Sequence, residues 1–277
     1  MDSAFRAAYA ELLRHWTLPV ESLTQESEFG STHVNACGPP DAPPLVLLAG
    51  HGATSPVWFG QANHLGQNHR IYAIDLIIDA GLSVNSGRKV TRPEDLRQWL
   101  TAVLDGLQLP RTHLCGHSYG SWVALSYALH APDRVDKLAL IDPTDCFTPL
   151  RTSYVLRALP SLLKPTSART KSFLLWETQG VPINPAWLEL AGLAAEFPKP
   201  RLVRPKRPTD EALRTLHPDL VVVIADHSKS QNPTQLATRV QTLIPTATIT
   251  HLPTATHHSL PAAHTEELAA ALEKHLS

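Results

Sequence analysis

The chain has 277 residues, which suits one large domain with room for an insertion. Its 24 Lys and Arg nearly balance its 25 Asp and Glu, and the net charge of −1 argues against a nucleic-acid or anionic-membrane partner. The three cysteines include no close pair, which argues against a disulfide framework or a zinc site, and no motif implies a cofactor.

The N-terminal segment Met1–Trp16 is predicted to form an amphipathic helix. It mixes acidic and basic residues with apolar ones and has no basic-then-apolar signal pattern. No apolar stretch elsewhere reaches the length that would span a membrane. We therefore expect a soluble, cytoplasmic protein without a membrane partner.

Short apolar runs bounded by turn residues recur along the chain and predict buried strands. Between several of these runs, apolar residues recur at helical spacing. Strands that alternate with helices imply a mainly parallel sheet with helices on both faces. The predicted strands are Glu21–Phe29, Ser31–Ala36, Leu45–Ala49, Ile71–Asp75, Thr112–Cys115, Leu138–Ile141, Leu220–Ile224 and Thr248–Leu252, and the main predicted helices are Leu96–Leu107, Ser121–His130 and Glu266–Leu276.

One interval breaks this alternation, because the 76 residues of 143–218 separate two predicted strands. That is too long for an ordinary connection, and it holds helix-like pieces broken by prolines. Open α/β sheets place their sites at the carboxyl ends of the strands, so we expect a helical cap there over a core of residues 1–142 and 219–277. The apolar residues expected to wall a pocket in part, with Trp176 a candidate substrate contact, are Phe147, Leu156, Leu159, Phe173, Leu175, Trp176, Trp187 and Leu190.

The segment Gly116–Gly120 reads Gly-His-Ser-Tyr-Gly, and its setting carries more information than the pattern alone. A short apolar strand precedes it and a helix-like stretch follows. Strand, sharp turn and helix form the context of a nucleophile elbow, in which the serine hydroxyl stands clear of the sheet. The flanking glycines fit because the turn is crowded and a Cβ would clash there. The sequence therefore predicts Ser118 as a nucleophile.

A serine hydroxyl is a weak nucleophile until a neighbouring base takes its proton. The expected base is a histidine on the loop after the last strand, and both His257 and His258 lie there. The short turn that precedes them favours His257. His51 and His117 adjoin the predicted site and are interpreted, with Gly50, as lining of the substrate pocket.

An oxyanion hole requires two backbone N–H groups. Tyr119 supplies one because it follows the nucleophile at the start of a helix. The second is expected from the loop after the first buried strand, Gly50–Ala53. His51 is the best placed donor there through its main chain, with its side chain free to face the substrate.

The order of these motifs resembles the α/β-hydrolase family, and in particular its capped, single-domain esterase-like and lipase-like members. The resemblance covers about residues 20–277. It implies a twisted, mostly parallel eight-stranded sheet and a Ser–acid–His triad that works by acyl transfer. The motifs that carry it are Gly50-His51-Gly52, the elbow, Asp142, the cap-length interval, Asp226 and His257.

The acid of this triad has two candidates. In the family it usually lies just past the seventh strand, where this chain has Ser228 in the acid's place and Asp226 two residues earlier. Asp142 ends the sixth strand beside the strand of the nucleophile, where some branches, including certain dehalogenases, carry the acid. From there its carboxylate could reach the Nδ1–H of His257. Asp142 is favoured as the acid of the triad, and Asp226 remains an alternative. In a third interpretation Asp142 has no catalytic role and only opens a turn.

The sequence thus predicts a serine hydrolase that acts on a small to medium, largely apolar ester, thioester or lactone. The unusual acid position leaves open a lyase, isomerase or cyclase of a biosynthetic pathway, or a ligand-binding protein with a relaxed site. A further alternative keeps Ser118 and cleaves a C–C bond next to a carbonyl. A serine at the elbow disfavours dehalogenase and epoxide-hydrolase chemistry, for which resembling enzymes carry an aspartate.

Overall fold

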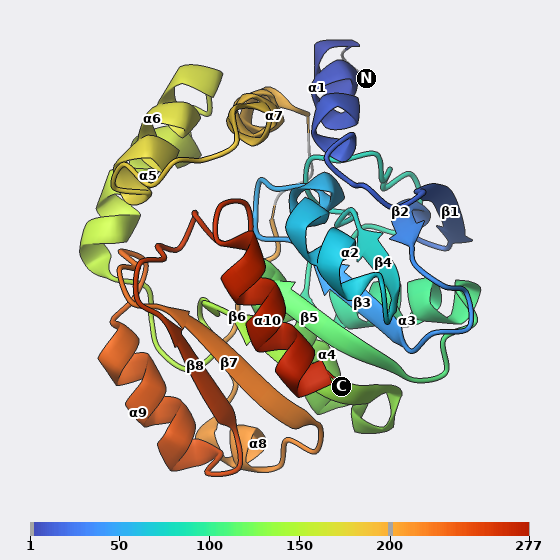
Figure 1. Ribbon diagram of the computed structural model, residues 1–277, viewed down its shortest axis with the longest axis vertical. Helices are drawn as coiled ribbons and strands as arrows, with labels where there is room; N and C mark the ends of the chain where they lie inside the picture. Colours follow the sequence, from blue (N-terminus) through green and yellow to red (C-terminus); the bar gives the residue numbers. More distant parts are fainter. Residues whose placement is uncertain (1–2, 199–201, 277) are drawn as a thin grey trace.

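The computed structural model describes residues 3–198 and 202–276, in which one eight-stranded sheet forms the centre (Figure 1). Its strands are β1 (Glu21–Ser27), β2 (Gly30–Cys37), β3 (Pro44–Leu48), β4 (Arg70–Ile74), β5 (Thr112–His117), β6 (Val135–Ile141), β7 (Asp219–Ala225) and β8 (Thr248–Leu252). They lie in the order β1-β2-β4-β3-β5-β6-β7-β8. β1 pairs antiparallel with β2, and β2 with β4, whereas all the other pairs are parallel. The predicted mostly parallel eight-stranded sheet is confirmed.

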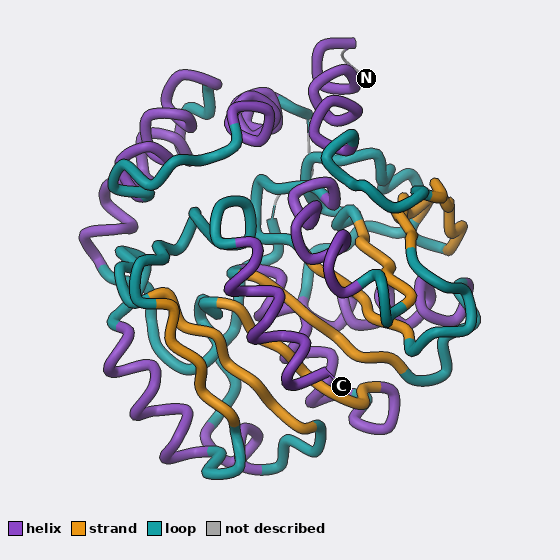
Figure 2. The backbone as a smooth tube through the Cα atoms, viewed as in Figure 1, coloured by secondary structure: helices purple, strands orange, loops and turns teal. Residues whose placement is uncertain are grey.

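Helices cover both faces of this sheet, as Figure 2 shows. They are α1 (Ser3–Leu13), α2 (Phe59–Leu65), α3 (Pro93–Gly106), α4 (Tyr119–His130), α5 (Thr152–Leu163), α6 (Ser167–Glu177), α7 (Pro185–Glu196), α8 (Asp210–Arg214), α9 (Pro233–Leu243) and α10 (Thr265–Leu276), with short 3-10 helices at Ser55–Trp58 and Pro132–Arg134. Within the described ranges, none of these helices combines the length and apolarity needed to cross a membrane.

Two apolar cores lie between the sheet and its helices because strand side chains alternate between the faces. In β3, Val46 and Leu48 pack into a core with α3, α4, α8 and α9. Leu45 and Leu47 point the other way, into a core with α1, α2 and α10. Burial on both faces explains why the strands of the parallel part read as continuous apolar runs.

Two helices outside residues 143–218, α2 and α9, were not predicted from the sequence. α2 is short and shows too few apolar positions for a helical period to be visible. α9 does carry such a signal, because Leu236, Val240 and Leu243 recur at helical spacing after the proline that begins the helix. Asn232 accepts a hydrogen bond from the N–H of Gln235 and caps α9, a start signal that the sequence contains.

Between β6 and β7 the chain leaves the sheet for residues 143–218, here called the insertion. Helices α5, α6 and α7 pack side by side in it, apart from the sheet (Figure 1). α7 also packs on α1, and the rings of Phe5 and Phe197 lie 4.6 Å apart between them. The N-terminal helix therefore supports the insertion as well as the sheet.

Candidate active site

The segment Gly116–Gly120 makes a sharp turn between β5 and α4. Ser118 adopts φ 54° and ψ −117°, a backbone conformation that residues other than glycine rarely take. A Cβ on Gly120 would lie 2.1 Å from the carbonyl oxygen of Leu48, and one on Gly116 would lie 2.3 Å from the carbonyl oxygen of Gly120. Both positions thus require glycine because backbone meets backbone there, and the strained turn places Ser118 at the end of β5.

The imidazole of His257 lies between the Ser118 hydroxyl and the Asp142 carboxylate. Its Nδ1–H donates to Oδ2 of Asp142 at 2.6 Å, which leaves Nε2, 2.8 Å from Oγ of Ser118, to accept the hydroxyl proton. His257 and Asp142 are 1% and 0% exposed. His258, the other candidate base, instead forms a 2.8 Å hydrogen bond between its Nε2 and the Tyr154 hydroxyl. The structure therefore brings Ser118, His257 and Asp142 together in one hydrogen-bonded row, here called the relay.

The sheet explains how Asp142 reaches this position. β5 and β6 are parallel neighbours, and His117 pairs with Ile141 at their last residues. Ser118 and Asp142 follow directly and so leave the sheet at the same level. Asp142 turns out of the strand with φ 38°, and its N–H donates to the carbonyl of Val223 on β7 at 2.7 Å.

Hydroxyl groups from the loop after β7 hold the Asp142 carboxylate. Ser228 donates to its Oδ2 at 2.7 Å and Ser230 at 3.3 Å. Burial alone raises the pKa of Asp142, but hydrogen bonds from His257 and Ser228 hold that pKa below its ordinary value. The carboxylate is therefore ionised although it is fully buried, as a group that orients an imidazole requires.

Asp226, the alternative acid, lies elsewhere. Its Oδ1 is 2.6 Å from Nδ1 of His251 on β8, and both side chains are partly exposed. Its N–H donates to the carbonyl of Leu252, so residue 226 continues the β7–β8 ladder. The side chain consequently faces the neighbouring edge strand, and the structure does not bring it to His257.

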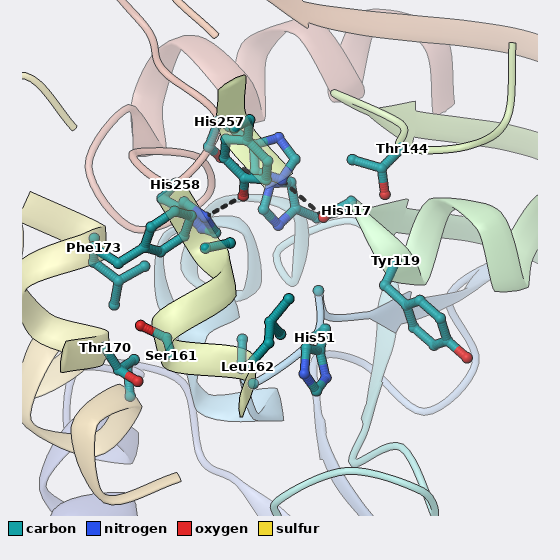
Figure 3. Close-up of a pocket in the computed structure, with 18 of the residues that line it drawn as sticks. His51, His117, Tyr119, Thr144, Ser161, Leu162, Thr170, Phe173, His257 and His258 are labelled. Carbon is teal, nitrogen blue, oxygen red and sulfur yellow. Dashed lines mark hydrogen bonds between the residues drawn. The ribbon is translucent and has the colours of Figure 1, made fainter. Parts of the chain in front are cut away.

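A cavity of about 420 Å³ opens at the relay, a volume in the usual range for small-molecule sites. Ser118 and His257 lie in its wall, with Gly50, His51 and His117 of the predicted lining. Figure 3 shows His257 and His258 together on one side, with His51 and Leu162 across from them. The insertion contributes a largely apolar wall that includes Val155, Ala158, Leu162, Phe173, Trp187 and Ala191.

Trp176, the predicted substrate contact, does not line this cavity. On α6 the cavity-facing residues are Thr170, Phe173 and Leu174, and Trp176 lies about a third of a turn away from them. Its ring instead meets two cations, with Nζ of Lys229 4.5 Å and Cζ of Arg157 5.6 Å from the centroid. The apolar character of Trp176 was visible in the sequence, but the rotation of α6 was not.

Only some of the other residues predicted to wall the pocket line this cavity. Of that set, Phe173 and Trp187 line the cavity, whereas Phe147 and Leu190 are buried in the cores and Leu156, Leu159 and Leu175 are exposed. α5 has one broad apolar face, of which part lines the cavity and part is exposed, so the sequence pattern does not indicate which part faces the cavity. The residues that do face it include Tyr154 and Ser161, which carry polar groups that hydropathy reasoning passed over.

The loop after β3 forms the cavity wall near Ser118. Oδ2 of Asp79 accepts the N–H of Gly52 at 2.7 Å and lies 2.7 Å from Nδ1 of His51. The N–H of Ala53 donates to the carbonyl of Gly50 at 3.1 Å. Two N–H groups of the loop are therefore engaged within the protein, which favours that of His51 as the donor to a substrate oxygen.

Tyr119 contributes through its main chain rather than its ring. The ring turns away from the cavity (Figure 3), and its hydroxyl donates to the carbonyl of Val203 at 2.9 Å. Its N–H lies in the first turn of α4, where the helix leaves backbone donors without intrahelical partners. Within the described ranges, no group of three or more His, Cys, Asp or Glu side chains is arranged to hold a metal ion.

His117 lines the cavity and also makes a hydrogen bond that sequence reasoning missed. Its Nε2–H donates to the main-chain carbonyl of His257 at 3.0 Å. Burial and the nearby His257 lower the pKa of His117 to about 3, so the ring is neutral and keeps one N–H for this bond. The residue before Ser118 thus supports the loop that carries His257.

The chain is similar to known proteins over most of its length. A family model described as alpha/beta hydrolase fold matches residues 43–172. An uncharacterized carboxylesterase, nap, of Bacillus subtilis (strain 168) is 30% identical over 246 residues, which span 86% of this chain and 80% of the relative. Carboxylesterase YbfK of the same organism is 28% identical over 250 residues, spanning 87% and 83%. The crystal structure of naproxen esterase (carboxylesterase NP) from Bacillus subtilis matches with a TM-score of 0.88 at 26% identity, over 99% of this chain and 97% of that one.

Proposed function

The chain belongs to the α/β-hydrolase fold family, and we propose that it hydrolyses small to medium, largely apolar carboxylic esters through an acyl-enzyme on Ser118. The observation that carries this proposal is the hydrogen-bonded order of Ser118, His257 and Asp142 at the wall of a largely apolar cavity. Similarity to two proteins named as carboxylesterases supports the same reaction. Thioesters and lactones present the same reacting carbonyl and fall within the proposal.

The geometry supports an acyl-transfer mechanism. Ser118 attacks the carbonyl carbon while Nε2 of His257 takes the hydroxyl proton, and ionised Asp142 stabilises the resulting imidazolium. The N–H groups of His51 and Tyr119 hold the oxyanion. His257 then gives its proton to the departing alcohol, and the acyl group remains on Ser118. A water molecule, deprotonated by His257, attacks the acyl-enzyme and releases the acid.

The insertion acts in this proposal as a cap of residues 143–218 over a core of residues 1–142 and 219–277. Its helices α5, α6 and α7 supply the wall that faces Ser118 across the cavity, which supports this division. The wall is mostly apolar, so the cap favours substrates whose acyl or alcohol part is apolar. The small molecule that binds is thus selected by the insertion and attacked by residues of the core.

The alternatives to hydrolysis rested on the unusual position of the acid. Asp142 hydrogen-bonds His257 from the end of β6, so that position no longer favours a lyase, an isomerase, a cyclase or a relaxed binding site. A serine hydroxyl hydrogen-bonded to a base suits an attack on a carbonyl carbon. Cleavage of a C–C bond would use the same relay, and release of acid from simple esters separates the two reactions.

Intact mass after incubation with a fluorophosphonate, together with turnover of p-nitrophenyl butyrate, tests the proposal. Wild type should gain one adduct, and Ser118→Ala should gain none and lose turnover by about 10⁴-fold or more. Ser153→Ala is the matched control, because Ser153 is an exposed serine on α5 that does not line the cavity. Its labelling and turnover should equal those of wild type. Ester turnover that survives in Ser118→Ala would refute the mechanism.

A further inference from the structure

A carboxylate of the insertion is buried against the loops of the active site. Glu177 is the last residue of α6 and is 0% exposed. Glutamate is almost never fully buried unless its partners replace the lost hydration. The carboxyl end of a helix is also where a negative charge is least favourable. Glu177 therefore lies at a costly position, and its contacts must offset that cost.

These contacts are backbone N–H groups of two active-site loops. Oε1 of Glu177 accepts from the N–H of His257 at 3.1 Å and from that of Lys229 at 3.2 Å, and Oε2 accepts from the N–H of His258 at 2.8 Å. Hydrogen bonds to an ionised acceptor are stronger than those between neutral groups. One side chain of the insertion thus joins the loop after β7 to the loop after β8.

The main chain of His257 is held from two sides. Its N–H donates to Glu177, and its carbonyl accepts from Nε2 of His117, the residue before the nucleophile. With both groups fixed, the imidazole can move only by its side-chain torsions, and bonds to Asp142 and Ser118 restrict these. The position of the base therefore depends on the insertion as well as on the sheet.

Two more contacts tie the insertion to these loops. The ammonium group of Lys229 donates to the main-chain carbonyl of Trp176, next to Glu177. On α5, Tyr154 shares its hydrogen bond with His258. Neither contact reaches the main chain of His257, which distinguishes Glu177 from them.

We propose that Glu177 is a positioning residue, which fixes the main chain of His257 from the insertion and so holds the imidazole in line with Ser118. The inference rests on the proposed function, because it concerns the base of the same site. Glu177 does not line the cavity, so it acts on the base and not on the bound substrate. Its loss should accordingly lower kcat and leave KM unchanged.

The variant Glu177→Gln tests this, because glutamine has the same shape but only one acceptor oxygen, so its NH₂ group must face either the N–H of His258 or the N–H groups of His257 and Lys229. The control is Glu196→Gln, since Glu196 also accepts a backbone N–H in the insertion, that of Ser167 at 2.7 Å. In Glu177→Gln, kcat on p-nitrophenyl butyrate and the rate of fluorophosphonate labelling should fall together by about tenfold or more. KM should stay at the wild-type value, and Glu196→Gln should match wild type in all three measurements.

A wild-type kcat in Glu177→Gln, or a loss that arises in KM alone, would overturn the inference and leave the proposed function standing. If the glutamine variant does not fold, Glu177→Asp provides the same test, since it keeps the charge and withdraws the carboxylate by one methylene. A reduced kcat in that variant supports the inference, and a wild-type kcat overturns it. Failure of the proposed function would be seen in wild type itself, as an absence of labelling and turnover, and would overturn this inference with it.

Discussion

At the scale of single residues, the surroundings of Asp142 explain how a buried carboxylate can stay ionised beside His257. It accepts from the imidazole of His257 and from the hydroxyl groups of Ser228 and Ser230. Ser228 stands where the family resemblance places the acid. The loop after β7 therefore still reaches this site, but it contributes a hydroxyl donor to the carboxylate of Asp142, which directly follows β6.

Replacing each candidate acid by asparagine distinguishes them. Asp142→Asn should lower kcat on p-nitrophenyl butyrate by about 10⁴-fold, because an amide cannot stabilise the imidazolium and favours the wrong tautomer of His257. Asp226→Asn breaks only a partly exposed pair with His251, so its kcat should stay close to that of wild type. Steady-state kinetics with circular dichroism as a folding control measures both. The reverse ranking would show that Asp142 is not the acid.

At the scale of elements, the elbow depends on how closely α4 approaches β3. Gly120 lies in the first turn of α4, against the carbonyl oxygen of Leu48 at the end of β3. A backbone group cannot move aside as a side chain can, so the helix reaches this distance only without a Cβ. The same approach directs the first turn of α4, with the N–H of Tyr119, toward the cavity.

Gly120→Ala should therefore destabilise the protein by about 3 kcal/mol, the upper range for forcing extra volume into a packed region. Gly192→Ala on α7 is the control. The atoms nearest to a Cβ there would be the Ser167 hydroxyl and the aliphatic chain of Lys171, which are side-chain groups and can rotate away. Its free energy of unfolding should hold or rise, since alanine favours helices over glycine by about 1 kcal/mol. Urea unfolding measures both, and equal effects of the two variants would contradict the elbow argument.

At the scale of the whole molecule, the parallel sheet gathers residues that are far apart in the chain. Ser118 and His257 are 139 positions apart, and His257 and Asp142 are 115 apart. They meet because β5, β6 and β8 end at the same edge of the sheet, where the insertion faces them. In the proposed function the core thus supplies the chemistry, and the insertion supplies the opposite wall of the cavity.

Substrate range should accordingly follow the shape of the insertion. Ala158→Phe fills part of the cavity from α5, and it should lower kcat/KM for long-chain esters relative to an acetate by about tenfold or more. Leu156→Phe is the control, since Leu156 lies on the same helix but is 63% exposed. A panel of p-nitrophenyl esters of increasing chain length measures the ratio. An unchanged ratio in Ala158→Phe would mean that the acyl chain does not occupy this side of the cavity.

The sequence by itself determined what depends on neighbouring residues. The buried strands, the strand–turn–helix elbow at Ser118 and the late histidine loop are all local patterns of apolar runs, glycines and turn residues. The mainly parallel class of the sheet followed from the alternation of predicted strands with predicted helices. These features could be predicted because each is set by spacing within a short stretch of chain.

Only the tertiary structure decided which distant residues meet. That Asp142 and not Asp226 meets His257 depends on which strands are neighbours and which way each side chain leaves the sheet. The absence of Trp176 from the cavity depends on the rotation of α6, and the burial of Glu177 depends on how α6 docks on two loops. Lateral order, helix rotation and docking are set by packing between segments far apart in the chain, so no local pattern in the sequence encodes them.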